Sequence, residues 1–250
     1  MIHSILIIGQ SNMAGRGIPT EVAPIINHRI SVLRNGRWRP MYTPVNPDRA
    51  SSGINLAESF ADLYSREKEV DVGIIPCADG GTSLDQWAEG GLLFDHACYM
   101  AELASRTSTI VAVLWHQGES DCFDHLYPNY RQKLSHIIAA FRKRLDLYDV
   151  PFILGGLGDF LADCTIAPEC KNYPHVNSAL MSLKNDEERI GFVSAEGLGA
   201  NPDNLHFCAA ALREFGTRYY AEFSRLEKKD RVFVEKPSAD LAIVNKIESL

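Results

Sequence analysis

The chain has 250 residues, a length that one large domain accommodates better than two small ones. Hydrophobic residues make up 46% and charged residues 23%, close to the average of soluble globular proteins, which excludes a disordered or fibrous chain. The 25 Lys and Arg against 32 Asp and Glu give a net charge of −7, and no basic run interrupts it, so nucleic acid is not an expected partner.

The first apolar run and the cysteines bear on cellular location. Ile5–Ile8 is too short for a secretory signal, and the longest apolar runs elsewhere have the size of strands, so no membrane partner is expected. The six cysteines include no CxxC pair, which argues against a zinc ribbon or thioredoxin motif. We therefore expect reduced thiols and a cytoplasmic protein. A secreted protein whose signal has been removed, with Cys164 able to bridge Cys170, is the alternative.

Strand-like and helix-like segments alternate along most of the chain. Short apolar runs predict buried strands at Ser4–Ile8, Ile30–Leu33, Val70–Ile75, Thr109–Leu114, Pro151–Leu154 and Ile190–Ser194. Apolar residues spaced by three and four predict helices at Leu56–Glu67, Leu92–Ser105, Tyr127–Leu147, Val176–Asp186 and Cys208–Phe223. This alternation predicts an α/β fold in which helices connect five or six strands of a doubly wound parallel sheet.

The chain after residue 227 departs from this alternation. It contains a possible strand, Val232–Glu235, and Pro237-Ser238 opening a short helix. We therefore expect one domain over residues 1–227. Residues 228–250 form a C-terminal extension that packs on this domain or mediates contact in a homo-oligomer.

Four polar segments, three of which contain glycine, directly follow or adjoin the predicted elements at one edge of the sheet. Ligands of doubly wound sheets bind beyond the carboxyl ends of the strands, so these segments predict the site. They are Gly9–Gly15, Cys77–Ser83, Trp115–Asp121 and Asn201–His206.

Ser11, Asp203 and His206 have the residue types of a nucleophilic triad. Ser11 follows a strand by two residues, where backbone N–H groups can stabilise negative charge, although an N-capping serine is the simpler interpretation. A serine nucleophile needs a neighbouring base and the base needs an orienting carboxylate. Asp203 and His206, three residues apart before a helix, fit these two roles, although Asp203 alone is also a suitable helix cap.

The four segments together resemble the sialate O-acetylesterase and acetylxylan esterase branch of the SGNH hydrolase superfamily, which includes carbohydrate esterase family six. The resemblance is carried by Gly9-Gln10-Ser11-Asn12-Met13, by Gly80-Gly81-Thr82-Ser83 with Trp87, by Trp115-His116-Gln117-Gly118-Glu119-Ser120-Asp121 and by Asp203-Asn204-Leu205-His206. It runs in order from about Ile2 to Phe223. It implies a flavodoxin-like three-layer α/β/α sandwich, with Ser11 as the nucleophile, Asp203 as the acid and His206 as the base.

An oxyanion hole is expected around Ser11, whose own N–H is the first donor. Gly53 lies before a predicted helix, and the resemblance places the second donor there, although an ordinary loop glycine is the alternative. The resemblance gives the third donor as the side chain of Gln117, for which a structural hydrogen bond is the alternative.

Six residues of the motifs are expected to contact the substrate: Gln10, Asn12, Gly81, Thr82, Trp87 and Glu119. The indole of Trp87 is suited to stack on a sugar, or it packs in the interior. Glu119 contacts substrate hydroxyls or orients its loop. His116 and Glu119 lack a third ligand, so no metal and no cofactor are expected.

These expectations describe a serine esterase that removes O-acetyl groups from carbohydrates through an acetyl-enzyme. The resemblance implies acetylated xylo-oligosaccharides or sialic acids as substrates. A general lipase or thioesterase of the superfamily, which needs an apolar acyl groove, and a catalytically silent carbohydrate-binding domain are the alternatives.

Overall fold

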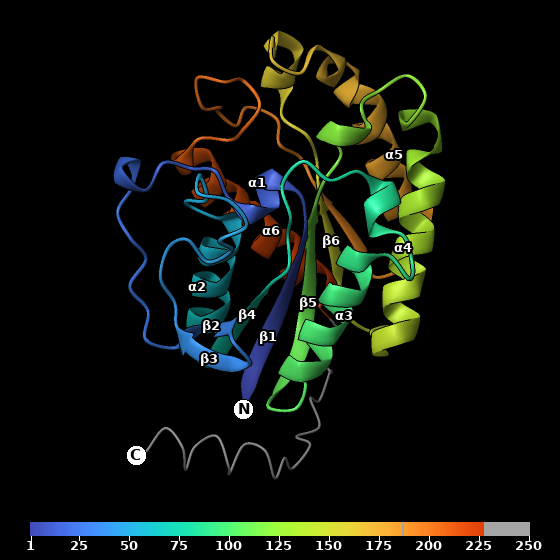
Figure 1. Ribbon diagram of the computed structural model, residues 1–250. Coiled ribbons are helices and arrows are strands. Elements are labelled where there is room, and N and C mark those ends of the chain that lie inside the picture. The colour runs from blue at the N-terminus through green and yellow to red at the C-terminus, as the bar shows by residue number, and fades with distance from the viewer. Residues whose placement is uncertain (187, 228–250) are drawn as a thin grey trace.

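A computed structural model describes residues 1–186 and 188–227 of the chain (Figure 1). The predicted tail, with its possible strand and helix, lies outside the described residues. None of the described helices is both long and apolar enough to cross a membrane.

Within the described residues the core is a seven-stranded sheet in the order β3-β2-β4-β1-β5-β6-β7. The strands are β1 (Ile2–Gly9), β2 (Ile30–Arg34), β3 (Arg37–Pro40), β4 (Asp71–Pro76), β5 (Ser108–His116), β6 (Phe152–Gly155) and β7 (Ile190–Val193). All neighbouring pairs are parallel except β2 and β3, which form an antiparallel hairpin. All six predicted strands are confirmed, and the predicted count of five or six is short by the edge strand β3.

Helices cover both faces of the sheet, which confirms the α/β/α sandwich (Figure 1). On one face lie α2 (Leu56–Lys68) and α6 (Ala209–Leu226), and on the other lie α3 (Leu92–Ala104), α4 (Tyr130–Leu145) and α5 (Tyr173–Asp186). The alternation of side chains along β1 explains this arrangement, because Leu6 and Ile8 face one helix layer while Ile5 and Ile7 face the other. A strand apolar on both sides must lie between two layers.

The central strand β1 is also where the order of the sheet reverses. The chain adds β4 on one side of β1 and then crosses to add β5 on the other. At such a switch point the loops after neighbouring strands part, which leaves room for a ligand. The short helix α1 (Ser11–Ala14) begins at this point, directly after β1 (Figure 1).

All six cysteines are free thiols. The Sγ atom of Cys164 lies 3.8 Å from the carbonyl oxygen of Asp203, whereas that of Cys170 lies 3.6 Å from the carbonyl oxygen of Glu119. The two thiols are therefore engaged separately, and the structure contains no bridge between them.

Candidate active site

The first part of the site is the turn that carries Ser11. Gly9 ends β1 with a φ of +131°, and a Cβ atom there would lie 2.1 Å from the carbonyl oxygen of His116. Only glycine fits, because this backbone conformation and this close approach both exclude a side chain. The N–H of Gln10 donates to that same carbonyl oxygen at 2.9 Å, so β5 fixes the turn that presents Ser11 at the start of α1.

The second part is the loop between β7 and α6, which carries Asp203 and His206. Two backbone hydrogen bonds close its base: Asn201 N–H donates to His206 O at 2.7 Å, and Cys208 N–H donates to Gly199 O at 3.1 Å. Inside the loop, Oδ1 of Asp203 accepts the backbone N–H of Leu205 at 2.9 Å and of His206 at 3.0 Å. The aspartate thus shapes the turn that holds the histidine.

These two parts meet in one chain of hydrogen bonds. Nδ1 of His206 lies 2.7 Å from Oδ2 of Asp203, and Nε2 of His206 lies 3.0 Å from Oγ of Ser11. Burial raises the pKa of Asp203, but the hydrogen bonds from His206 and the backbone outweigh it and hold the pKa below its ordinary value. The charged carboxylate can only accept, so Nδ1 carries the proton and Nε2 is left to accept the proton of Ser11.

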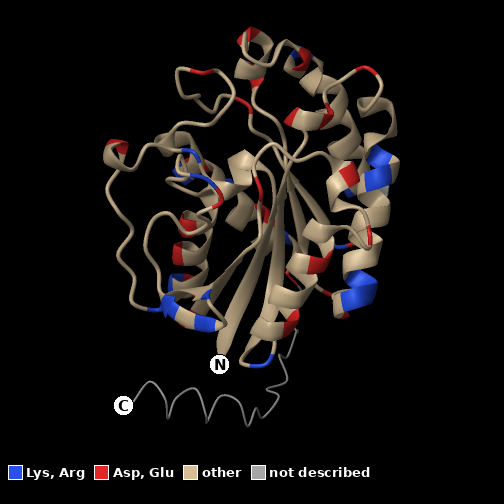
Figure 2. Ribbon diagram, viewed as in Figure 1, with Lys and Arg blue, Asp and Glu red and all other residues tan. Residues whose placement is uncertain are grey.

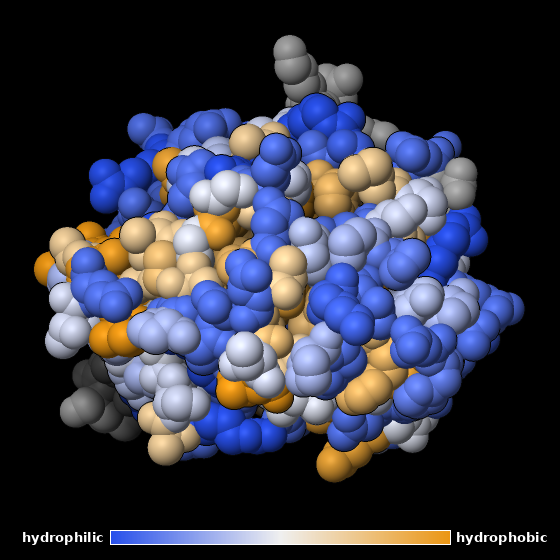
Figure 3. All heavy atoms as spheres, turned by 90° about the horizontal axis from the view of Figure 1, so that it is seen from above, coloured by the Kyte–Doolittle hydropathy of each residue, from blue (hydrophilic) through white to orange (hydrophobic). Residues whose placement is uncertain are grey.

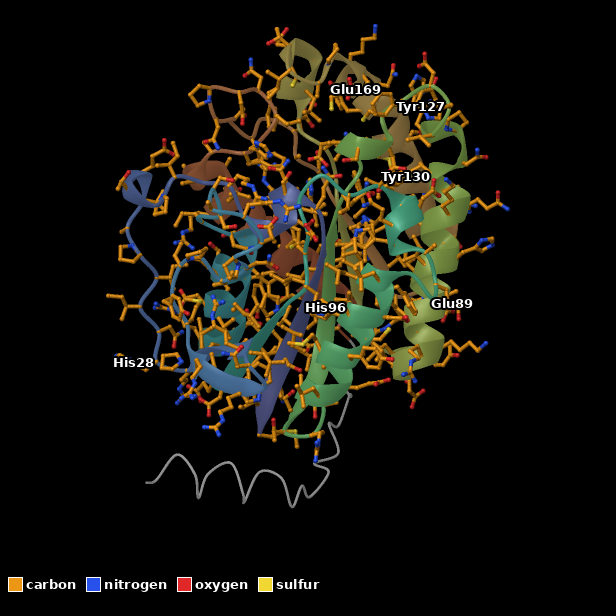
Figure 4. All side chains as sticks on the ribbon, viewed as in Figure 1. His28, Glu89, His96, Tyr127, Tyr130 and Glu169 are labelled. Atoms are coloured by element: carbon orange, nitrogen blue, oxygen red, sulfur yellow. The ribbon has the colours of Figure 1, made fainter. Side chains whose placement is uncertain are left out.

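Two of the other histidines lie well away from these hydrogen bonds. Figure 4 shows His28 near the opposite end of the molecule and His96 on α3, both away from the turn of α1. Of the residues predicted to form a triad, the structure brings all three together, although 195 residues separate Ser11 from His206.

A buried ion pair that the sequence did not predict holds the loop after β4 next to the turn of Ser11. Arg16 donates to both carboxylate oxygens of Asp48, at 2.9 and 2.7 Å, and the two side chains are only 7% and 5% exposed. Oδ2 of Asp48 also accepts the N–H of Gly80 at 2.8 Å. A Cβ atom at Gly80 would lie 3.5 Å from that of Ser11, so this pair fixes the loop after β4 against the turn of Ser11.

The ionic state of Asp48 follows from these contacts. Burial raises its pKa, but the hydrogen bonds from Arg16 and Ser52, the charge of Arg16 and the N–H of Gly80 together hold it below the ordinary value. Arg49, which is half exposed, extends the cluster toward solvent by donating to Gly80 O at 3.1 Å. No sequence pattern connects Arg16 with Asp48, because the contact joins two irregular loops 32 residues apart.

Two of the three predicted oxyanion donors are corrected by the structure, because their N–H groups already donate to other protein groups. The N–H of Gly53 donates to the carbonyl oxygen of Gly15 at 3.1 Å and is therefore already used. The side chain of Gln117 is fully buried, and its Nε2 donates to Thr82 O at 3.0 Å and to Oδ2 of Asp121 at 2.5 Å. An amide has two N–H donors, so none remains for a substrate. Gln117 instead fastens the loop after β4 to the loop after β5.

Most of the predicted substrate contacts are corrected as well. Side chains that are 0–5% exposed offer almost no surface to a ligand, and this holds for Gln10, Asn12, Thr82, Trp87 and Glu119. The indole N–H of Trp87 donates to Oγ1 of Thr82 at 3.0 Å, and its ring packs edge-on against Trp115, so it cannot stack on a sugar. The sixth residue, Gly81, is exposed at the site.

The buried motif residues hold the loops of the site to one another. The side-chain oxygen of Gln10 accepts the N–H groups of Gly118 and Ser120, each at 3.3 Å. Oε1 of Glu119 accepts from Nδ2 of Asn12 at 2.5 Å and lies 3.9 Å from Nδ1 of the buried His116. In the described part of the chain, no group of three or more His, Cys, Asp or Glu side chains is arranged to hold a metal ion.

Comparison with known proteins identifies the family. The family model described as "Carbohydrate esterase, sialic acid-specific acetylesterase" matches residues 2–225. The chain belongs to this family. A probable carbohydrate esterase of Arabidopsis thaliana is 30% identical over 238 residues, which cover 84% of this chain and 86% of the plant protein. Family membership supports an esterase that acts on carbohydrates.

Solved structures similar to this carbohydrate esterase share its architecture. The X-ray structure of the Arabidopsis thaliana protein has a TM-score of 0.78 at 28% identity, covering 90% of this chain and 99% of that one. NanS has a TM-score of 0.70 at 19% identity and 90% and 97% coverage. A lipase/acylhydrolase from Enterococcus faecalis, at 10% identity with 92% and 100% coverage, has a TM-score of 0.58. The SGNH hydrolase fold expected from the motifs is thereby confirmed.

Proposed function

We propose that this protein is a serine esterase that removes O-acetyl groups from carbohydrates, with Ser11 as nucleophile, His206 as general base and Asp203 as the residue that orients the base. The observation that carries the proposal is the continuous hydrogen-bond chain from Ser11 Oγ through both nitrogens of His206 to Asp203. A serine hydroxyl in this arrangement can lose its proton at the moment of attack, which is what acyl transfer requires.

The reaction divides into two steps. As Ser11 Oγ bonds to the acetyl carbon, its proton passes to Nε2 of His206, and the carbonyl oxygen becomes an oxyanion. The bond between the acetyl carbon and the sugar oxygen then breaks, and His206 gives the proton to that oxygen. Water attacks the acetyl-serine in the same way, giving up a proton to His206, and acetate and free Ser11 are formed.

We assign the oxyanion donors to the backbone N–H groups of Ser11 and Gly81. Among the residues that the structure describes, no group accepts a hydrogen bond from either N–H. Gly81 follows Gly80, which contacts the Ser11 turn, and its φ of +76° with open space around it leaves the backbone accessible. Losing one such donor costs roughly 10²–10³-fold in rate in a well-studied protease.

The proposed substrates are acetylated sialic acids and acetylated xylo-oligosaccharides. The description of the family model supports the first, and the probable carbohydrate esterase relative supports carbohydrate esters in general. Figure 3, which shows the molecule from above, has hydrophilic and hydrophobic residues intermixed on this face. A mixed surface suits a sugar ester better than a long acyl chain, so a lipase or thioesterase is the less favoured alternative. A silent binding domain would not require the complete hydrogen-bond chain.

The test is release of acetate by the purified full chain from p-nitrophenyl acetate and from a panel of O-acetylated sialic acids and xylo-oligosaccharides. Ser11→Ala should remove nearly all activity. Ser105→Ala, at the end of α3 on the far side of the molecule, is the matched control and should retain it. Acetate release that persists in Ser11→Ala would refute the proposed nucleophile. Activity confined to long-chain esters would favour the lipase alternative.

A further inference from the structure

One buried side chain, Asn12, holds the nucleophile and the base loop in register. Its Nδ2 donates to the carbonyl oxygen of Leu205 at 3.2 Å, and its Oδ1 accepts the N–H of Phe207 at 3.0 Å. These two groups stand on either side of His206 in the chain. Asn12 itself follows Ser11 directly in α1. A single amide thus connects the turn of the nucleophile to both neighbours of the base.

Glu119 adds a third contact, which fixes the orientation of this amide in the same sense as the two backbone groups. An asparagine amide can rotate by half a turn, exchanging its donor and its acceptor ends. A carboxylate accepts hydrogen bonds and cannot donate them. Because Oε1 of Glu119 lies 2.5 Å from Nδ2 of Asn12, the donor end must face Glu119. The acceptor end is then directed at the N–H of Phe207.

Glu119 is in turn fixed from several sides. Its own backbone lies in the short 3-10 turn η3 (Glu119–Asp121), which Gln10 holds through the N–H groups of Gly118 and Ser120. The carboxylate is 4% exposed, and its Oε2 is a buried oxygen for which the described residues provide no hydrogen-bond partner. The carboxylate is therefore held in place by its backbone turn and by its bond to Asn12.

We propose that Asn12 and Glu119 are positioning residues of the esterase, acting through one another to set the distance between Ser11 Oγ and His206 Nε2. The inference rests on the proposed function of the triad. On this inference, Asn12 and Glu119 occur in the motifs because they position the triad, and not because they contact the substrate.

A structural comparison within the protein supplies the control. Asn177 on α5 also bonds to a loop backbone through both ends of its amide. It donates to Leu157 O at 3.0 Å and accepts the N–H of Leu157 at 2.7 Å, in the loop after β6. That loop carries no residue of the triad. Asn12→Ala and Asn177→Ala therefore both remove a pair of side-chain bonds to a loop backbone, and only Asn12 also bonds to Glu119 and lies between nucleophile and base.

The experiment measures kcat and KM of acetyl ester hydrolysis for Asn12→Ala, Glu119→Ala, their double variant and Asn177→Ala. A misplacement of about 1 Å can cost about 10²-fold. We expect kcat of Asn12→Ala to fall about 10²-fold with KM within about threefold, because the ester contacts neither residue. Asn177→Ala should keep kcat within about threefold. The double variant should be no slower than Asn12→Ala, because both residues act through one contact.

Two further measurements separate positioning from a general structural role. The rate of inactivation by a serine-directed phosphonate should fall in parallel with kcat, since it reports the activation of Ser11 without the sugar. Glu119→Gln, whose side-chain oxygen can still accept from Asn12, should recover most of the activity that Glu119→Ala loses. Circular dichroism and thermal unfolding establish that each variant is folded. If Asn12→Ala does not fold, Glu119→Ala, which leaves both backbone bonds of Asn12 in place, should by itself lose at least tenfold in kcat.

The outcomes discriminate between the two proposals. A folded Asn12→Ala that keeps kcat within about threefold, while Ser11→Ala is inactive, would overturn the positioning role and leave the esterase mechanism intact. Additive losses in the double variant would also contradict it. Activity that survives Ser11→Ala would instead remove the proposed function on which the inference rests.

Discussion

Replacing Asp203 by asparagine tests the electrostatic logic of the site with almost no change in shape. The side-chain oxygen of the introduced amide can still accept the two backbone N–H groups that Oδ1 of Asp203 accepts at 2.9 and 3.0 Å, so the loop should keep its form. The amide nitrogen then faces Nδ1 of His206, where the carboxylate oxygen was 2.7 Å away. Since an amide nitrogen donates, Nδ1 must accept, and the ring proton moves to Nε2.

The magnitude follows from that change of tautomer. With a proton on Nε2, His206 donates to Ser11 Oγ at 3.0 Å and can no longer accept its proton. The equivalent substitution in a well-studied serine protease lowers kcat about 10⁴-fold. The Asp203 side chain is 33% exposed, so water partly replaces the lost charge here. We therefore expect a fall of about 10³-fold, which corresponds to about 4 kcal/mol of transition-state stabilisation.

The assay compares kcat and KM for p-nitrophenyl acetate and for an acetylated sugar in wild type, Asp203→Asn and Asp62→Asn. Asp62 lies on α2 and bonds to Asn27 and Arg66, away from the triad, so its substitution controls for loss of one negative charge. The loss should be confined to kcat. A tenfold or smaller fall in Asp203→Asn, or an equal fall in the Asp62 control, would refute the reasoning.

Three more predictions follow from the contacts of the site. Asp48→Ala leaves the Arg16 guanidinium buried without its partner and should lower the free energy of unfolding by about 3–5 kcal/mol, measured by urea denaturation. The pKa of Asp48 in the folded protein lies below the ordinary value of about 3.9, so its contribution to the free energy of unfolding is present above that pH and is lost as the pH falls further. The difference in stability between wild type and Asp48→Ala should therefore shrink below about pH 4. Trp87→Phe removes the bond to Thr82 and should lower stability by about 1 kcal/mol while KM for acetylated sugars stays unchanged; a large rise in KM would restore the indole as a sugar contact. Gly9→Ala should give little folded protein by circular dichroism, since its Cβ would collide with β5, and normal yield would contradict the turn geometry.

The layers of the fold could be predicted because they depend on local patterns. β1 and β5 are apolar on both faces, and α2 and α6 carry one apolar stripe each, so a sheet between helices was the arrangement that buried all of them. The edge strand β3 was missed because Arg37–Pro40 is mostly exposed and has no apolar alternation. Its pairing comes from the neighbouring β2 through the two-residue turn Asn35-Gly36, whose φ angles of +50° and +75° are typical of a hairpin, so the available signal lay in the turn and not in the strand. Figure 2 shows basic residues on this hairpin and on α4, while acidic residues mark the upper turns η5 (Asp159–Asp163) and η6 (Pro168–Asn172).

The meeting of Ser11 with His206 could be predicted for a topological reason, whereas the hydrogen-bond partners of Gly53 and Gln117 could not. Ser11 and His206 both follow parallel strands, whose carboxyl ends share one edge, so strand assignment places both residues at that edge. Their direct contact also needs the long loop after β7, because β7 lies three positions from β1 in the sheet. Whether the N–H of Gly53 or the amide of Gln117 is free depends on which carbonyl lies opposite it. The carbonyl oxygen of Gly15 accepts the N–H of Gly53, and that of Thr82 accepts from Gln117. Both contacts join separate loops, so no local sequence pattern predicts them.

The burial of the motif side chains also changes where substrate specificity must be sought. The site loops are held together by the side chains of Gln10, Asn12, Gln117 and Glu119. A change of substrate therefore does not require a change at these four positions. Surfaces that a sugar can reach around the triad belong to other positions. Arg49 is half exposed beside Gly80 and forms an ion pair with the partly exposed Asp79 at 2.8 Å. The partly buried ring of Phe160 packs edge-on against Phe207, 4.9 Å away, next to the base. If the proposed esterase function holds, we expect selection between a charged and a neutral acetylated sugar to change with substitutions at positions of this kind and not at the buried motif residues.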